Sequence, residues 1–290
     1  MTDSSSPWTL RNAPVRPREW SALVATPGAF HVQDEGGELL LAPDDRGQMR
    51  LHWAYSGIEV MRNLFAKQFD QVRKHITADR TDYAVMDLIA FVNRDWVDPL
   101  LRETNFDLFA EWMDMAHPAL DTVPVPEIPE GVTIRRSTPA DTERLRAIWT
   151  DAYGEYGDGP RSFDPMLAEA TWAGVLERQG EIIGFALNGA ITRGEGRILC
   201  VAMDPEHQGH GGGKLLLSAA LYQLASKDAT SAVIRVRPDI KHALRICSSL
   251  GMRHQRSGVE YRRSIDADER AAERAANRTA GVRARMGRWR

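Results

Sequence analysis

The sequence predicts two α/β domains, each with a mixed sheet covered by helices. Three observations support this prediction. Apolar segments with the two-residue repeat of strands alternate with segments of helical spacing. A proline-rich stretch lies near the middle of the chain, and the same order of elements occurs on both sides of it. At 290 residues the chain is long enough for two domains that each bury a core.

The proline-rich stretch marks the expected domain boundary. It contains four prolines: Pro118, Pro124, Pro126 and Pro129. Proline removes a main-chain donor and favours extended neighbours, so residues 118–130 should form a semi-rigid linker. One domain is then expected at 1–117 and the other at 131–265, followed by a tail at 266–290.

The second half alternates strands and helices in an order typical of an α/β domain. The expected strands are 132–136, 175–178, 182–187, 197–203 and 232–236, with two short strands finishing near Ser264. Helices are expected to open at Thr138-Pro139-Ala140-Asp141 and at about Pro165, and to cover 211–226 and 240–250. The turn Gln179-Gly180 should close a β-hairpin.

The first half shows a shorter version of this order. A hairpin of 38–42 and 48–55, turning at 44–47, is followed by a helix at 58–75, a strand at 83–92, a helix at 96–102 and a strand at 106–115. This correspondence indicates a diverged internal duplication. The alternative is that any α/β domain shows such alternation.

Composition limits the classes of protein to which the chain can belong. A net charge of -3 gives no general reason to expect nucleic acid or a membrane as partner. The N-terminus is polar, no apolar run reaches membrane-spanning length, and only Cys200 and Cys247 occur, both in apolar segments. We expect a cytoplasmic protein. Its basic tail is interpreted as a solvated or frayed helix, with nucleic-acid contact as the alternative.

A glycine-rich segment carries the main functional signal. An apolar strand ends at Asp204-Pro205, and a helix begins after the pattern Q-x-x-G-x-G, formed by Gln208, Gly211 and Gly213. Unpaired N–H groups at such a helix start, without crowding side chains, favour an anion. His210 and Lys214 could add positive charge. Leu215 after Lys214 excludes a Walker loop, and the glycine spacing excludes a dinucleotide fold, so a purely structural glycine turn is the alternative.

These residues resemble the GNAT superfamily of N-acetyltransferases in three blocks. The run V-A-M-D-P-E-H-Q-G-H-G-G-G-K-L-L (201–216) is similar to its acetyl-CoA motif, A-L-R-I-C-S-S-L-G-M (243–252) to its A-x-x-L-Y-x-K-L-G-F block, and 176–185 to a hairpin of its sheet. The resemblance implies a mixed-sheet GNAT fold at 131–265, acetyl-CoA as co-substrate and no metal. The first half would be a degenerate second GNAT-like domain.

The resemblance also implies a cofactor site. The strands 197–203 and 232–236 would splay to leave a wedge, in which Val201, Ala202 and Met203 meet the pantetheine arm. An N–H group near Met203 would polarise the thioester carbonyl. N–H groups of the loop would hold the diphosphate, from Gln208, Gly209, His210, Gly211, Gly212, Gly213 and Lys214.

The catalytic residues are less clear, because Cys247 stands where the family usually has a tyrosine acid. Cys247 could donate a proton if well placed, or it could simply fill the core, in which case solvent or a residue such as Tyr153 or Tyr156 would be the acid. Glu195 is the first candidate base, followed by Asp151 and Glu155. An acceptor pocket for a cationic amine is expected at Asp151, Glu155, Tyr156 and Asp158, which could equally form an exposed polar loop.

The first half lacks the cofactor signal. Its corresponding loop has one glycine, Gly57, and Glu59 where an anion would sit. It should serve packing, pairing or substrate enclosure, and a homodimer is possible. The sequence thus favours acetyl transfer to a primary amine of a small molecule. A protein or RNA acetyltransferase and a non-catalytic acyl-CoA-binding module are the alternatives.

Overall fold

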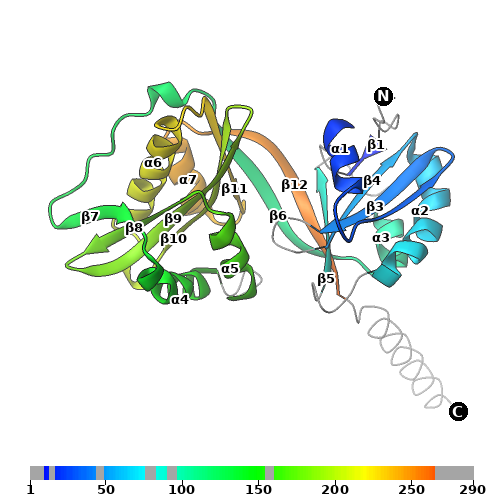
Figure 1. Cartoon of the computed structure of the whole chain (residues 1–290), viewed down its shortest axis with the longest axis horizontal. Coiled ribbons are helices and arrows are strands. Elements are labelled where there is room, and N and C mark those ends of the chain that lie inside the picture. Colours follow the sequence, from blue (N-terminus) through cyan, green and yellow to red (C-terminus); the bar gives the residue numbers. More distant parts are fainter. Residues whose placement is uncertain are drawn as a thin grey trace, which may run out of the picture. The chain divides into compact units, whose positions relative to one another are not determined.

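The chain folds into two units, each with its own core and its own part of one 12-stranded sheet (Figure 1). The computed structural model describes residues 10–12, 17–43, 49–75, 83–89, 97–153 and 160–264. Unit 1 consists of Met1–Ala110 and Gly258–Arg290, and unit 2 of Glu111–Ser257. The predicted turn at 44–47 and the tail at 266–290 lie outside the described residues.

Unit 1 contains a sheet with the strand order β2-β3-β4-β5-β12. Its elements are β1 (Leu10–Arg11), α1 (Pro17–Val24), β2 (Phe30–Asp34), β3 (Gly37–Pro43), β4 (Met49–Tyr55), α2 (Ile58–Val72), the 3-10 helix η1 (Arg73–His75), β5 (Tyr83–Ile89), α3 (Asp98–Glu103), and the first part of β6 (Asp107–His117). The predicted β3–β4 hairpin and α2 are confirmed, whereas α1 and β2 were not predicted. Residues of α2 and α3 build the larger core with Trp53 and Tyr55, and α1 covers the other face through Trp20.

The split between the parallel strands β4 and β5 is a notable feature of unit 1. They pair only at Met49↔Ala84 and Arg50↔Val85. Strand β3 pairs with one edge of β4 along the whole length of β4. The short strand β1 must therefore pair with the other edge of β4, which is also the edge that β5 uses. There Leu10 pairs with Tyr55. The split of unit 1 is therefore filled by the chain's own N-terminal segment.

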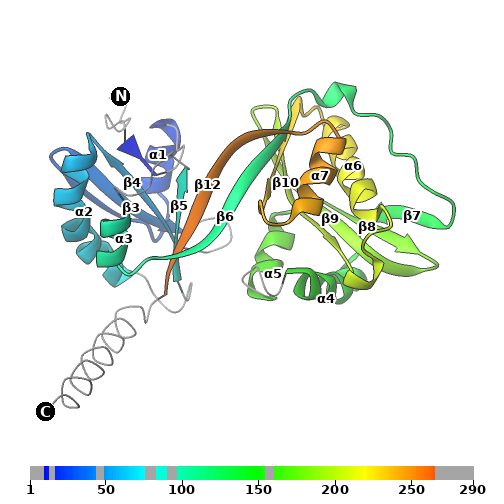
Figure 2. The same cartoon turned by 180° about the vertical axis from the view of Figure 1, so that it is seen from behind.

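Unit 2 repeats this sheet in the order β6-β11-β10-β9-β8-β7 (Figure 2). Its elements are the second part of β6, the 3-10 helix η2 (Leu120–Thr122), β7 (Val132–Arg136), η3 (Pro139–Asp141), α4 (Thr142–Tyr153), α5 (Pro160–Glu169), β8 (Trp172–Arg178), β9 (Glu181–Thr192), β10 (Glu195–Met203), η4 (Pro205–His207), α6 (Gly212–Ala225), β11 (Ser231–Val236), α7 (Lys241–Ser249) and the start of β12 (Arg253–Ser264). Helices α6 and α7 cover one face, and α4 and α5 the other.

Two long strands explain why the units differ from the domains expected at 1–117 and 131–265. The end of β6 pairs with β11, from Met113↔Val236 to His117↔Ala232, so it completes the sheet of unit 2. The end of β12 pairs with β5 and completes the sheet of unit 1. The two short strands expected near Ser264 are thus one strand, β12. Strand periodicity shows that a segment is extended, but not which sheet it joins.

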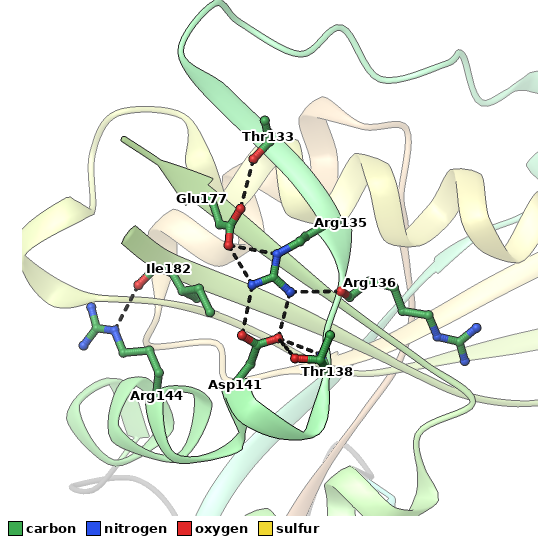
Figure 3. A network of polar contacts seen from close by, with 8 residues as sticks. All are labelled: Thr133, Arg135, Arg136, Thr138, Asp141, Arg144, Glu177 and Ile182. Carbon is green, nitrogen blue, oxygen red and sulfur yellow. Dashed lines mark hydrogen bonds and ion pairs between the residues drawn. The ribbon is translucent and has the colours of Figure 1, made fainter. Parts of the chain in front are cut away.

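The start of α4 is fixed by the capping pattern that the sequence predicts. Thr138 and Asp141 form a reciprocal capping box, in which the Asp141 carboxylate accepts from the Thr138 N–H group (2.6 Å). Arg135 on β7 donates to both oxygens of Asp141 (2.7 and 2.9 Å) and to Glu177 on β8 (Figure 3). One guanidinium therefore joins two strands to the N-terminus of α4.

Candidate active site

The candidate site lies where β10 continues after β11 has left it. The two strands pair in parallel from Glu195↔Ser231 to Ile198↔Ile234, and the ladder ends there. Irregular pairing with β9 around Ile198 bends β10 at this point. Beyond it, β11 stays paired with β6. The splay expected from the family resemblance is therefore present, and it opens a wedge along the last residues of β10.

Main-chain groups of Val201 and Met203 face this wedge. The N–H group of Asp204 donates to Ile183 on β9 (2.9 Å), so by strand alternation residues 201 and 203 face the opposite edge. The Val201 carbonyl accepts from the Tyr153 hydroxyl (2.7 Å), and the Met203 carbonyl from the Gln208 side chain (3.4 Å). The N–H groups of Val201 and Met203 are directed into the wedge. The main-chain groups of Ala202 point the other way, towards β9.

The loop after β10 presents a row of N–H groups at the start of α6. The first main-chain hydrogen bond of the helix runs from Leu215 N–H to the Gly211 carbonyl (3.1 Å). In the described part of the chain, the N–H groups of Gly209 to Lys214 donate to no main-chain carbonyl. The Gln208 N–H group instead bonds the Pro205 carbonyl (3.4 Å), which corrects its expected place in the anion cradle.

The glycines of this loop have different roles. Gly209 and Gly211 have φ of +84° and +85°, in the left-handed region that favours glycine, and a Cβ on either would meet open space. A Cβ on Gly212 would lie 2.7 Å from Met203 Cε, so Gly212 permits close packing of α6 on β10. Gly213 has room for a Cβ, the nearest atom being 3.5 Å away. The protein's own packing therefore does not require glycine at position 213, and its expected role beside a diphosphate stays a prediction.

Asp204 anchors the start of the loop. Its carboxylate accepts from the Glu206 N–H group (3.0 Å) and pairs with Arg144 on α4 (2.5 Å). Burial opposes ionisation of Asp204, but these two hydrogen bonds outweigh it and hold the pKa of the carboxyl below its usual range. Arg144 also donates to the Ile182 carbonyl (Figure 3). This anchor was not predicted, although an aspartate before Pro205 is a recognisable helix-cap signal.

Tyr153 brings a phenol to the wedge from the end of α4. Besides its hydrogen bond to Val201, it interacts with the thiol of Cys200. Burial is the largest cause that raises the pKa of the phenol well above its usual value, followed by Cys200 and Cys247. The phenol is therefore protonated at neutral pH and acts as a donor.

Cys247 lies on α7 in the core beneath α6 and is 2% exposed. Burial raises the pKa of its thiol to about 11, so the thiol is neutral. The side chain fills space between the helix and the sheet, which agrees with the packing alternative.

The candidate base Glu195 is not brought to the wedge. It is exposed, pairs with Ser231 at the start of β10, and lies six residues before Val201, which corresponds to about 20 Å along a strand. We therefore do not retain it as the base. Asp151 is exposed on α4, two residues before Tyr153 and so on a different side of the helix. Glu155, Tyr156 and Asp158 lie outside the described residues. His210 and Lys214 are exposed at the loop, where they could approach an anion.

Comparison with known proteins identifies the family of this region. A model of the acetyltransferase (GNAT) family matches residues 142–252. A mycothiol acetyltransferase from Tsukamurella paurometabola is 31% identical over 171 residues, covering 52% of this chain and 59% of that protein. One from Streptomyces coelicolor is 29% identical over 175 residues, covering 56% of each. The chain thus matches a little over half the length of these curated relatives.

Solved structures share the fold. A GCN5-related N-acetyltransferase from Kribbella flavida superposes with a TM-score of 0.59 at 23% identity, covering 84% of this chain and 92% of that one. A tandem GNAT protein from the clavulanic acid biosynthesis pathway gives 0.56 at 13% identity, covering 83% and 85%. The predicted GNAT fold with a second, diverged unit is confirmed.

The described residues contain no group of three or more His, Cys, Asp and Glu side chains placed to hold a metal ion. None of their helices has the length and apolar character needed to cross a bilayer.

Proposed function

Residues 142–252 belong to the GNAT acetyltransferase family, and on that premise we propose that this protein transfers an acetyl group from acetyl-coenzyme A to a primary amine of a small molecule. The observation that carries the proposal is the combination of the open N–H groups at Gly209–Lys214 with the wedge beside β10. The names of the mycothiol acetyltransferase relatives support a small-molecule acceptor.

The diphosphate of coenzyme A would bind at the start of α6. The N–H groups of Gly209 to Lys214 and the positive end of the helix dipole favour a doubly charged anion, and Lys214 adds a formal charge. The pantetheine arm would then follow β10 into the wedge. Its amide groups could form hydrogen bonds with the main-chain groups of Val201 and Met203, because β11 no longer pairs with β10 at these residues.

The transfer step balances without a covalent enzyme intermediate. The neutral amine attacks the thioester carbon, the C–S bond breaks, and the proton lost by the nitrogen equals the one gained by the sulfur. An N–H group of Val201 or Met203 would stabilise the negative charge that develops on the carbonyl oxygen. The Tyr153 hydroxyl, which donates its proton to the Val201 carbonyl in this structure, would turn to donate a hydrogen bond to the leaving sulfur. Because the pKa of the phenol is raised well above its usual value, Tyr153 would keep its proton and act as a hydrogen-bond donor, not as an acid that transfers the proton.

Two measurements test the proposal. Calorimetric titration should show saturable binding of coenzyme A. Release of the free thiol from acetyl-CoA, followed over a panel of primary amines, should show turnover. Binding without turnover on any amine would favour a non-catalytic acyl-CoA-binding module, and no saturation with coenzyme A would refute the proposed cofactor site.

A further inference from the structure

A side-chain hydroxyl group lies at the wedge of unit 2. Tyr153 carries it there from the end of α4 and donates its proton to the Val201 carbonyl (2.7 Å). By strand alternation this carbonyl faces the wedge, so the hydroxyl bonded to it lies at the same place. The thiols of Cys200, in the core under α4, and of Cys247, in the core under α6, are both close enough to raise the pKa of the phenol. The hydroxyl therefore lies between the two layers of helices, at the open edge of β10.

The hydroxyl occupies an acceptor that the proposed cofactor also needs. The ladder between β10 and β11 ends at Ile198↔Ile234, so β11 no longer pairs with β10 at Val201. The pantetheine arm, placed along β10, would offer amide N–H groups to the same edge. In the structure the Tyr153 O–H group already fills this position. Two donors, one from the protein and one from the cofactor, thus compete for one carbonyl.

The phenol of Tyr153 has only one proton to donate. Burial is the main cause that raises its pKa well above the usual value, so the proton stays on the oxygen at neutral pH. Tyr153 cannot donate it to the Val201 carbonyl and to a leaving sulfur at the same time. If the hydroxyl simply turned away, the carbonyl would lose its donor in a wedge that the cofactor closes to water, which is unfavourable. Release of the hydroxyl therefore requires a replacement donor.

We propose that an amide N–H group of the pantetheine arm takes over the Val201 carbonyl, and that this exchange releases the Tyr153 hydroxyl towards the sulfur of coenzyme A. One O–H···O bond is replaced by one N–H···O bond, the hydroxyl bonds the sulfur, and no covalent bond changes. Tyr153 becomes available to the reaction only after the arm is in place. The inference rests on the proposed acetyl transfer and adds to it a step that couples cofactor binding to the hydrogen-bond donor.

Three ligands separate the parts of this exchange. Coenzyme A has the arm and the sulfur, desulfo-coenzyme A has the arm without the sulfur, and 3′-phosphoadenosine 5′-diphosphate has no arm and retains the diphosphate that the loop would bind. The wild type should bind coenzyme A about three- to fivefold more tightly than desulfo-coenzyme A, because desulfo-coenzyme A displaces the hydroxyl without offering it a new acceptor. Calorimetric titration measures these dissociation constants, and this first comparison needs no variant.

Tyr153→Phe removes the competing donor. Desulfo-coenzyme A should bind this variant about three- to fivefold more tightly than it binds the wild type. Coenzyme A should bind both proteins almost equally, because its sulfur gives the wild-type hydroxyl a new acceptor. The preference for the sulfur is therefore lost in the variant. Unchanged binding of 3′-phosphoadenosine 5′-diphosphate shows that the variant is folded and that its loop is intact. Tyr222→Phe, at an exposed tyrosine of α6, is the matched control and should behave as the wild type.

Either of two results overturns the exchange. Equal affinity of the wild type for coenzyme A and desulfo-coenzyme A would mean that the hydroxyl keeps its bond to Val201 and shares the carbonyl with the arm, since a carbonyl oxygen can accept two hydrogen bonds. A preference for coenzyme A that survives in Tyr153→Phe would mean that another group contacts the sulfur. Failure of coenzyme A to saturate the wild type would instead refute the proposed cofactor site, so the two failures can be distinguished.

Discussion

The strand-to-helix junctions of the two units have the same place in the fold but different chemistry. In unit 2, eight residues separate the end of β10 at Met203 from the start of α6 at Gly212. In unit 1, only Ser56 and Gly57 separate β4 from α2. The α2 cap Gly57 has φ of 179°, ordinary extended backbone, whereas the α6 cap Gly211 has φ of +85°. The short junction has no loop that could surround a diphosphate.

The wedges beside the two junctions differ as well. In unit 1, the main-chain N–H group of Asn12 donates to the Trp53 carbonyl (3.4 Å). The Asn12 side chain donates to Leu51 O (2.8 Å) and accepts from Trp53 N–H (2.9 Å). In unit 2, the corresponding edge of β10 meets single side-chain contacts from Tyr153 and Gln208. Unit 2 therefore leaves open both the loop and the strand edge that the proposed cofactor site needs, whereas unit 1 has neither.

The largest expected effect comes from matched substitutions at the two helix caps. Gly211→Leu should weaken coenzyme A binding at least about 100-fold, because the side chain enters the open space beside the cradle and φ of +85° is unfavourable for leucine. Gly57→Leu, where a Cβ also meets open space, should leave binding unchanged. Calorimetry measures both, and should give one coenzyme A per chain. Equal losses in the two variants would mean that the junctions do not differ as described.

Tyrosines of the two units give a second comparison. Tyr153→Phe should lower kcat about 10- to 100-fold with little change in the KM for acetyl-CoA, because only the hydrogen-bond donor is removed. The Tyr55 hydroxyl instead donates to Gln68 (2.6 Å) within the core of unit 1. Tyr55→Phe should lower stability by about 1 kcal/mol and leave kcat unchanged. Steady-state kinetics on both variants checks this, and an unchanged kcat in Tyr153→Phe excludes the phenol from the reaction.

Much of this comparison could be anticipated from the sequence, but not all of it. The Q-x-x-G-x-G pattern and the single Gly57 correctly separate the two junctions, since glycine spacing reports directly on local backbone geometry. The position of Glu195 relative to the wedge could not be read from spacing, because it depends on where β10 and β11 part. The contacts of Asp114 with Arg235 and Arg256 could not be read from spacing either, because strands β6, β11 and β12 bring these residues together across more than a hundred positions.

Asn12 allows the filled wedge of unit 1 to be opened. Asn12→Ala removes the partners of a buried carbonyl and a buried N–H group on β4, which should cost about 2 kcal/mol of unfolding free energy. Urea denaturation measures the loss. Coenzyme A binding should remain at one site per chain, because the short junction at Gly57 still lacks a cradle. A second coenzyme A site in Asn12→Ala would show that the segment of β1 and Asn12 beside β4, and not the short loop, excludes the cofactor from unit 1.

The capped helix α4 offers the smallest effect and a pH dependence. Hydrogen bonds from Arg135, followed by the Thr138 N–H group, hold the pKa of the Asp141 carboxyl far below its usual value. A lowered folded-state pKa stabilises the protein above the unfolded value of about 3.9 and loses that contribution as the pH falls towards the folded value. Because Arg135 is 37% exposed and therefore screened, Asp141→Asn should cost only about 1 kcal/mol at pH 7.

The difference between Asp141→Asn and the wild type should then shrink below about pH 4, because Asp141 binds a proton there in the unfolded wild type and not in the folded wild type. Urea midpoints measured between pH 7 and pH 3 check this. A constant difference for Asp141→Asn across the range would mean that the carboxylate acts through its shape and not through its charge.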